Sequence, residues 1–183
     1  MDKLREEIVK LLSQHPSKDH IGKFAQRIIQ DSELILLTIA LGRAYSGRVA
    51  NHASWALRKV FDTDQIILMA FREAIFEWLL ETHSDSVRRN LLPLASALVT
   101  FDFLEEYEVA GKLYDCCYDW SRSENFAIAV RCNAMQYLYE VAKFLPELSS
   151  ELIPVFEING QHGGSGLKSR SALLLRRLYV LRS

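Results

Sequence analysis

Residues 125–144 read NFAIAVRCNAMQYLYEVAKF, and this stretch decides the fold. Apolar residues recur in it at steps of three and four, which is the spacing of one buried face on an α-helix. The positions on this face are Phe126, Val130, Ala134, Leu138 and Val141. The stretch therefore predicts a helix that packs one side against a core.

The opening of this helix returns elsewhere in the chain. It consists of a Val-Arg pair with a small or apolar residue four positions after the valine, and weaker copies share parts of this pattern. The four copies begin at Val49, Val87, Val130 and Lys168, which are 38, 43 and 38 residues apart. A recurrence at this interval is typical of helical-repeat proteins.

The remaining periodicity predicts about ten helices and no strand. The expected helices cover residues 2–13, 17–30, 31–43, 48–61, 62–81, 84–100, 102–119, 124–144, 146–158 and 165–183. His15-Pro16 is expected to end the first helix, and Ser17 is expected to cap the second.

Three local features give further expectations. Asp102 and Glu105 resemble a capping box at the start of their helix. Pro93 stands inside a helical pattern, which predicts a kink or a late start. Residues 159–166 contain four of the eight glycines, and we expect a flexible linker there.

Composition indicates an ordinary globular chain. Of its 183 residues 49% are apolar and 25% are charged, and the formal net charge is −1, so no overall basic field attracts nucleic acid or a membrane surface. The longest stretch that is nearly all apolar, residues 34–41 with only Thr38 as a polar residue, is too short to span a bilayer. We expect one domain over residues 1–183, with capping helices in 1–30 and about four repeats in 31–183.

The three cysteines do not form a disulfide framework. Their number is odd, and Cys116 and Cys117 are adjacent. Free thiols in a reducing compartment are the better interpretation, so we expect a cytoplasmic location.

The repeated helix opening resembles that of HEAT-like (armadillo-type) repeats. The best copies are Ala129-Val130-Arg131 and Asp85-Ser86-Val87-Arg88, and the resemblance covers roughly residues 31–183. It implies an all-α fold, an αα-superhelix in which paired helices A and B stack with the B helices on the concave side. It also implies that Arg88 and Arg131 pair with an acidic residue of a neighbouring unit and have a structural role.

Charge is distributed unevenly between the two sets of expected helices. The B helices (48–61, 84–99, 124–143 and 165–183) carry twelve bases and three acids, whereas the A helices (31–43, 62–81, 102–119 and 146–158) carry three bases and sixteen acids. If the B helices line the concave face, a basic surface would favour an anionic partner. Pairing between neighbouring A and B helices would produce the same distribution without a ligand, and both interpretations remain open.

The best-placed contact residues point away from the buried stripe of each B helix. Counting from the four anchors, these residues are Asn51, His52, Trp55, Arg89, Asn90, Asn133, Gln136 and Arg170. Cys132 lies on the same ridge as Arg89. An indole beside histidine and asparagine suits stacking and hydrogen bonding to a ligand, although Trp55 could equally pack against the next repeat.

Patterns for catalysis, metals and cofactors are lacking in the sequence. The five histidines form no i,i+4 pair, and the glycine-rich stretch before Lys168 lacks the glycines and the preceding strand of a phosphate-binding loop. We therefore expect no catalytic residue, no metal and no cofactor.

These observations favour a non-enzymatic helical-repeat scaffold that binds a protein or an acidic peptide. The resemblance also offers an alternative, a DNA-binding protein like the alkylbase DNA glycosylases, for which Glu140 is the acid closest to the expected groove. A third hypothesis is a regulatory or oligomerising piece that dimerises through its terminal helices. No membrane partner is expected.

Overall fold

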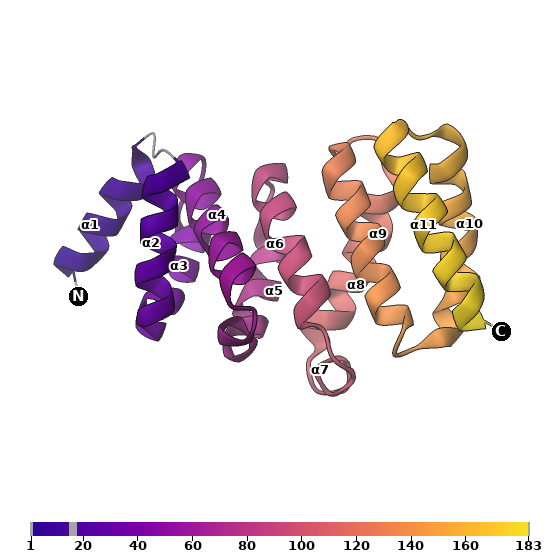
Figure 1. Ribbon diagram of the computed structural model, residues 1–183, viewed down its shortest axis with the longest axis horizontal. Helices are drawn as coiled ribbons and strands as arrows, with labels where there is room; N and C mark the ends of the chain where they lie inside the picture. Colours follow the sequence, from indigo (N-terminus) through magenta and orange to yellow (C-terminus); the bar gives the residue numbers. More distant parts are fainter. Residues whose placement is uncertain (1, 15–17, 183) are drawn as a thin grey trace. The chain divides into compact units, whose positions relative to one another are not determined.

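A computed structural model describes residues 2–14 and 18–182 of the chain (Figure 1). These residues contain eleven α-helices and two short 3-10 segments, and no strand. The all-α class predicted from the sequence is therefore confirmed. The predicted boundary at His15-Pro16 and the predicted cap at Ser17 lie outside the described residues.

The chain forms two compact units, divided between Leu94 and Ala95 inside helix α6 (Asp85–Leu98). Besides the start of α6, the first unit contains α1 (Asp2–Ser13), α2 (Lys18–Gln30), α3 (Ser32–Ala44), α4 (Arg48–Thr63), η1 (Ile66–Phe71) and α5 (Arg72–Glu81). Helix α4 packs against α1, α2 and α3, and α3 also packs against α5. In Figure 1, α2 and α4 lie in front of α3 and α5, so this unit has two helical layers.

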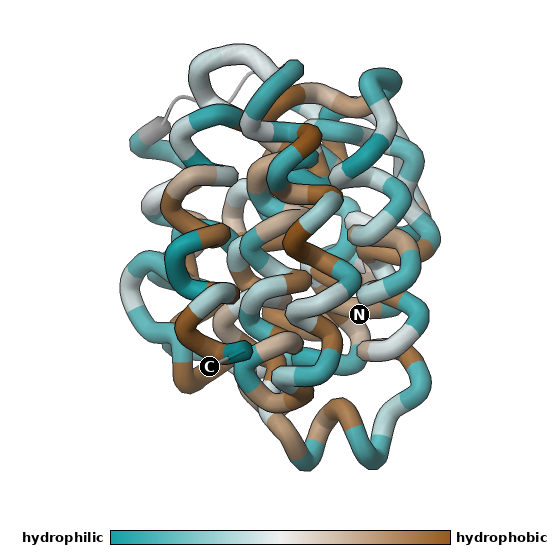
Figure 2. The backbone as a smooth tube through the Cα atoms, turned by 90° about the vertical axis from the view of Figure 1, so that its right-hand side faces the viewer, coloured by the Kyte–Doolittle hydropathy of each residue, from teal (hydrophilic) through white to brown (hydrophobic). Residues whose placement is uncertain are grey.

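The second unit has the same construction. Besides the end of α6, it contains α7 (Phe101–Glu106), α8 (Glu108–Arg122), α9 (Ile128–Ala142), η2 (Pro146–Leu148), α10 (Ser149–His162) and α11 (Ser165–Arg182). Helix α8 packs against α9, α10 packs against α11, and α9 also packs against α11. Figure 2 shows that hydrophobic and hydrophilic residues alternate around these helices, as expected when one side of each faces a core.

The repeated apolar stripe is confirmed in three of the four copies. Val49, Val87 and Val130 are buried, and Ala134, Leu138 and Val141 continue the stripe in α9. Phe126 is half-buried and precedes α9, which begins only at Ile128.

The fourth copy is shifted by one residue from its predicted register. Leu167, Ser171, Leu174 and Leu178 are buried along α11, whereas Lys168 is exposed. The buried anchor is thus Leu167, and the prediction of Lys168 was wrong. The core requires an apolar side chain at this position, which Leu167 provides and Lys168 does not.

The predicted helix 62–81 is interrupted. Helix α4 runs on to Thr63, and Asp64 adopts extended backbone angles. The Asp64 carboxylate accepts a hydrogen bond from the Ile66 amide at 3.0 Å, which opens a turn and leads into η1 rather than an α-helix.

The predicted capping box of Asp102 and Glu105 was wrong. The cap is Thr100, whose Oγ1 accepts a hydrogen bond from the Phe103 amide at 3.4 Å. The predicted helix 102–119 also divides, because Tyr107 is extended (φ −122°, ψ 107°) and separates α7 from α8.

The late start predicted at Pro93 and the flexible linker predicted at 159–166 were wrong, whereas the alternative of a kink at Pro93 stays a prediction. Helix α6 begins at Asp85 with Pro93 inside it, so the proline does not delay its start. The glycine-rich stretch 159–166 is mostly helical, because α10 continues to His162 and α11 begins at Ser165. Only Gly163 and Gly164 remain between the two helices.

Close packing between α3 and α5 requires a glycine at position 42. A Cβ atom built on Gly42 would lie 2.1 Å from Cη2 of Trp78, whose side chain is 2% exposed. A methyl group at this position would have to displace a buried indole.

Gly42→Ala should therefore lower the free energy of unfolding by about 1–3 kcal/mol, although alanine is the better helix former. Gly111→Ala is the matched control, because a Cβ on this exposed glycine of α8 meets nothing within 4 Å. It should raise stability by about 0.5–1 kcal/mol. Urea denaturation followed by circular dichroism measures both, and equal effects would contradict the packing explanation.

Candidate functional site

The arginine of the Val-Arg pair closes the end of the preceding helix. In the first unit, Arg88 is 8% exposed and its Nη2 donates to the carbonyl oxygen of Thr82 at 2.6 Å. Thr82 is the C-cap of α5, where carbonyl groups lack donors from their own helix. The Nη1 of Arg88 pairs with the carboxylate of Asp85 at 3.1 Å.

In the second unit, Arg131 occupies the equivalent position. It is 9% exposed, its Nε donates to the carbonyl oxygen of Ser121 at 3.3 Å, and its Nη2 donates to Oδ1 of Asn159 at 2.6 Å. The Nδ2 of Asn159 donates to the same Ser121 carbonyl at 3.0 Å. The prediction of an acidic partner in a neighbouring unit was wrong for Arg131, because its partner from α10 is an amide.

Two predicted contact residues of the first unit hold helices together. The Oδ1 of Asn51 accepts a hydrogen bond from the Ser84 hydroxyl at 2.9 Å. The Nδ2 of Asn90 donates to the Ser54 hydroxyl at 3.0 Å. These bonds connect α4 with the start of α6, so both side chains serve the packing of one B helix on the next.

The other predicted residues of this unit lie at its surface to different degrees. His52 is half-buried, and its Nδ1 lies 2.7 Å from the carbonyl oxygen of Leu12, so Nδ1 carries the hydrogen and ties α4 to α1. The half-buried Trp55 lies beside it, with ring centroids 6.3 Å apart. Arg89 is exposed.

In the second unit, the structure brings two predicted residues into direct contact. The Nη1 of Arg170 in α11 donates to Oε1 of Gln136 in α9 at 2.7 Å. Gln136 in turn donates to Glu140 at 2.7 Å, and Glu140 pairs with Lys143. Asn133 is half-buried on the same helix. Gln136 and Arg170 therefore form part of a continuous polar row across α9 and α11.

Cys132 lies beside this row and is half-buried. Burial raises the pKa of its thiol, and the nearby charges of Arg170 and Arg131 lower that pKa only in part. The thiol is therefore protonated at neutral pH, which does not suit a nucleophile.

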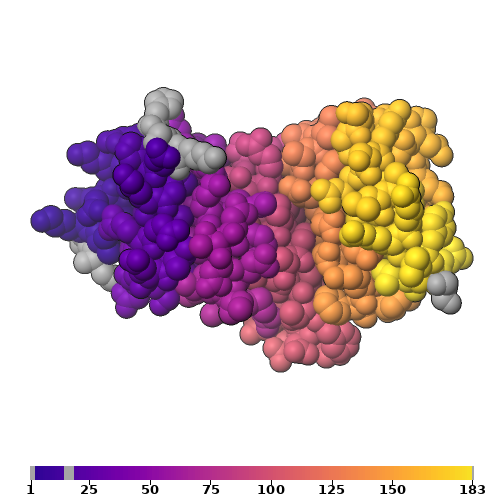
Figure 3. All heavy atoms as spheres, in the orientation of Figure 1, coloured from indigo at the N-terminus to yellow at the C-terminus, as the bar shows by residue number. Residues whose placement is uncertain are grey.

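Helix α11 carries a basic surface. Its residues 165–182 include five bases and no acid, and Arg176 is exposed. The guanidinium of Arg177 lies 5.7 Å from the centroid of the Tyr139 ring, and Leu173 is 42% exposed. We call Arg170, Leu173, Arg176 and Arg177 the basic α11 surface. In Figure 3, α11 (yellow) forms much of the face of this unit that is turned toward the viewer.

The uneven charge persists when helices are bounded as observed. The B helices α4, α6, α9 and α11 carry eleven bases and three acids, and the A helices α3, α5, α7, α8 and α10 carry four bases and twelve acids. Ion pairs that use these charges include Arg43–Glu77, Arg43–Glu81, Arg58–Asp62 and Lys112–Glu108. Each of these four joins residues within one helix or between two A helices, so none is a step of a ladder between A and B helices.

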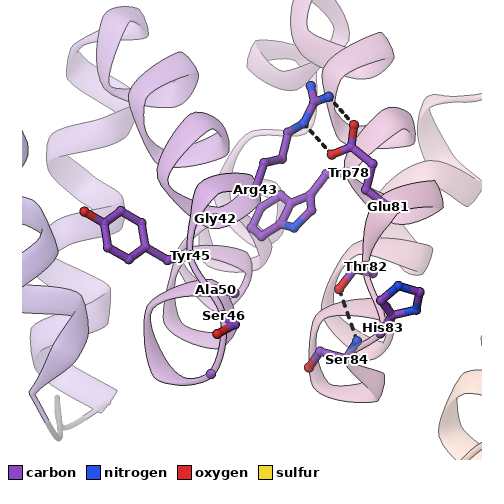
Figure 4. Close-up of a pocket in the computed structure, with 11 residues that line it drawn as sticks. Gly42, Arg43, Tyr45, Ser46, Ala50, Trp78, Glu81, Thr82, His83 and Ser84 are labelled. Carbon is purple, nitrogen blue, oxygen red and sulfur yellow. Dashed lines mark hydrogen bonds and ion pairs between the residues drawn. The ribbon is translucent and has the colours of Figure 1, made fainter.

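A pocket of about 390 Å³ lies at the helix turns of the first unit (Figure 4). Ala50, which stands where Val87 and Val130 are followed by arginine, lines this pocket together with Trp78 and Ser84. Arg43 lies at the pocket and forms hydrogen bonds with Glu81 and Glu77. The hydrogen bond to Glu81 raises the pKa of Arg43, which stays charged.

A second pocket, of about 250 Å³, lies at the equivalent turns of the second unit. Arg131 lines it, together with Arg122, Glu124, Val155, Ile158, Asn159, His162 and Gly163. These two pockets thus lie at the residue that follows the buried valine of their unit. From the sequence this position was predicted to be structural and neither pocket was predicted, although the change from arginine to Ala50 was a visible signal.

The described residues show two further properties. None of their helices is both long and apolar enough to cross a membrane. Within residues 2–14 and 18–182, no group of three or more histidine, cysteine, aspartate or glutamate side chains is arranged to hold a metal ion.

If Arg88 closes the end of α5, Arg88→Met should lower the free energy of unfolding by about 2–4 kcal/mol. The substitution removes the hydrogen bonds that the buried guanidinium makes with Thr82 and Asp85. Arg89→Met is the control, because Arg89 is exposed on the same helix, and it should change stability by at most about 0.5 kcal/mol. Chemical denaturation measures both values. A loss at Arg88 no larger than that at Arg89 would show that the cap is dispensable.

Comparison with known proteins gives one match. The family model of the HEAT repeat domain matches residues 8–173. No curated protein and no solved structure matches the chain. The matched range covers most of both units and all four copies of the repeated helix opening, and the chain belongs to the HEAT repeat family.

Proposed function

We propose that this HEAT repeat protein is a non-enzymatic scaffold that binds an acidic protein segment through its B helices, with the basic α11 surface as the main contact. The observation that carries the proposal is the composition of α11, in which five bases and no acid accompany an exposed apolar residue, Leu173. The cytoplasmic location predicted from the cysteines is part of the same proposal.

The geometry of the basic α11 surface favours a peptide ligand. Arg170 and Arg177 lie two turns apart on α11, and each is held by a residue of α9, namely Gln136 and Tyr139. Leu173 lies between them in sequence and is exposed. Pre-positioned guanidinium groups around an apolar contact suit a segment that alternates carboxylate and apolar side chains.

The DNA-binding alternative has less support. Its candidate acid, Glu140, accepts a hydrogen bond from Gln136 and pairs with Lys143, and its side chain is only 19% exposed. A carboxylate engaged in this way is poorly placed to stabilise a cationic base. The basic α11 surface could still contact phosphates, so the experiment below includes DNA.

A fluorescein-labelled peptide of alternating glutamate and leucine should bind the protein, and added salt should weaken the binding because salt screens the charges. Replacing both Arg170 and Arg177 by glutamine should weaken binding by about tenfold, since each exposed charge pair contributes up to about 1 kcal/mol. Fluorescence anisotropy measures the dissociation constant.

Lys112→Gln is the matched control, since Lys112 is exposed on the A helix α8. Its binding should equal that of the unmodified protein. The proposal fails if the acidic peptide does not bind, or if the double variant binds as well as the control. Tighter binding of a DNA duplex than of the peptide, lost in the same double variant, would favour the alternative.

A further inference from the structure

Arg131 is a buried cation without a carboxylate partner. It is 9% exposed, and its hydrogen bonds go to a backbone carbonyl and to the amide of Asn159. Neither of these bonds uses Nη1, and none of the ion pairs found among the described residues includes Arg131. A guanidinium this deeply buried is stabilised when an anion accompanies it.

The equivalent arginine of the first unit shows what is missing. Arg88 also donates to a carbonyl oxygen at the end of the preceding helix, through Nη2 where Arg131 uses Nε. Its Nη1, however, pairs with the Asp85 carboxylate three residues earlier. Three residues before Arg131 stands Ile128, which is 49% exposed. The second unit therefore retains the arginine and lacks the acid that accompanies it.

Arg131 borders an open pocket. Arg131 and Asn159 line this pocket of about 250 Å³, and Val155 and Ile158 add apolar walls. Arg122 and His162 also line it. Helix α9 starts beside Arg131 with no acidic residue in its first turn and no side-chain cap, so its N-terminal dipole adds positive potential.

We propose that the Arg131 pocket binds a carboxylate from outside the chain, as the side chain of an aspartate or glutamate in a peptide or as a small carboxylic acid. The incoming carboxylate accepts a hydrogen bond from Nη1 of Arg131, as the Asp85 carboxylate does from Nη1 of Arg88. This site is separate from the basic α11 surface and does not depend on the proposed function.

The structure favours a carboxylate over a phosphate. The equivalent guanidinium in the same chain already holds a carboxylate, at an Nη1–Oδ1 distance of 3.1 Å. Glu124 lines the pocket as well, and its negative charge opposes a doubly charged anion more than a singly charged one. The apolar walls suit the methylene groups of a glutamate side chain.

Ile128→Asp tests the assignment without removing Arg131. The new carboxylate is three residues before Arg131, as Asp85 is three residues before Arg88. It should therefore pair with Arg131 and exclude an external carboxylate. Ile128→Asn is the matched control, because asparagine has nearly the same shape and no charge. Both changes are at an exposed position, so both proteins should fold.

Nuclear magnetic resonance of the Arg131 Nε–H group and the Asn159 side-chain amide provides the readout. N-acetyl-glutamate amide, acetate and inorganic phosphate are the probes, and N-acetyl-glutamine amide is the uncharged control. In the unmodified protein and in Ile128→Asn, both signals should shift saturably with the two carboxylates and not with the glutamine compound. In Ile128→Asp the affinity should fall by at least about tenfold.

The two carboxylate probes distinguish the source of the ligand. Tighter binding of the glutamate compound than of acetate supports a peptide side chain, and equal binding supports a small carboxylic acid. The proposal is overturned if neither carboxylate gives a saturable shift, if Ile128→Asp responds like Ile128→Asn, or if phosphate binds more tightly than both carboxylates.

Discussion

The backbone carbonyl groups at the ends of the A helices impose the constraint on which each repeat depends. The last turn of a helix has no donors of its own, and in a packed repeat water does not reach all of these oxygen atoms. In two of the four repeats an arginine in the first turn of the following B helix supplies the donors, as Arg88 does for Thr82 and Arg131 does for Ser121. The neighbouring valine is buried in the core. The Val-Arg pair thus fixes the B helix by one apolar and one polar contact at adjacent positions.

Polar contacts between successive B helices are the second recurring element. Asn51, Asn90, Gln136 and Arg170 were expected to face a ligand, yet each makes a hydrogen bond that helps hold one helix to another or supports that contact. A ligand on this face would meet side chains that are already positioned, which lowers the entropy lost on binding. It would also have to match or replace the existing bonds.

The sequence predicted best the features that recur in several repeats and depend only on residues close together in the chain. The burial of Val130, Leu138 and Val141 follows from helical periodicity alone, because a stripe on one helix needs no knowledge of its partner. The breaks at Asp64 and Tyr107 could not be seen, since neither position has the glycine or proline that usually marks an interruption. In the fourth repeat the anchor was predicted one residue too late, at the charged Lys168 instead of the buried Leu167.

The candidate site depends on contacts that are distant in the sequence. Arg131 forms a hydrogen bond with Asn159, which is 28 residues away in the sequence. The periodic pattern of apolar residues does not reveal that an amide at position 159 is a partner of this arginine. The absence of an acid at Ile128 becomes meaningful only when the Asp85–Arg88 pair is seen in the other unit. Sequence patterns predicted the type of scaffold, and the geometry of two equivalent turns was needed to find a pocket and a reason for a ligand.

The contact between Gly42 and Trp78 constrains how this chain can change over evolutionary time. A side chain at position 42 and an indole at position 78 exclude each other, so the two positions cannot vary independently. A smaller residue must replace the tryptophan before any larger residue can replace the glycine. Relatives of this protein should therefore show paired substitutions at these positions, reached in that order.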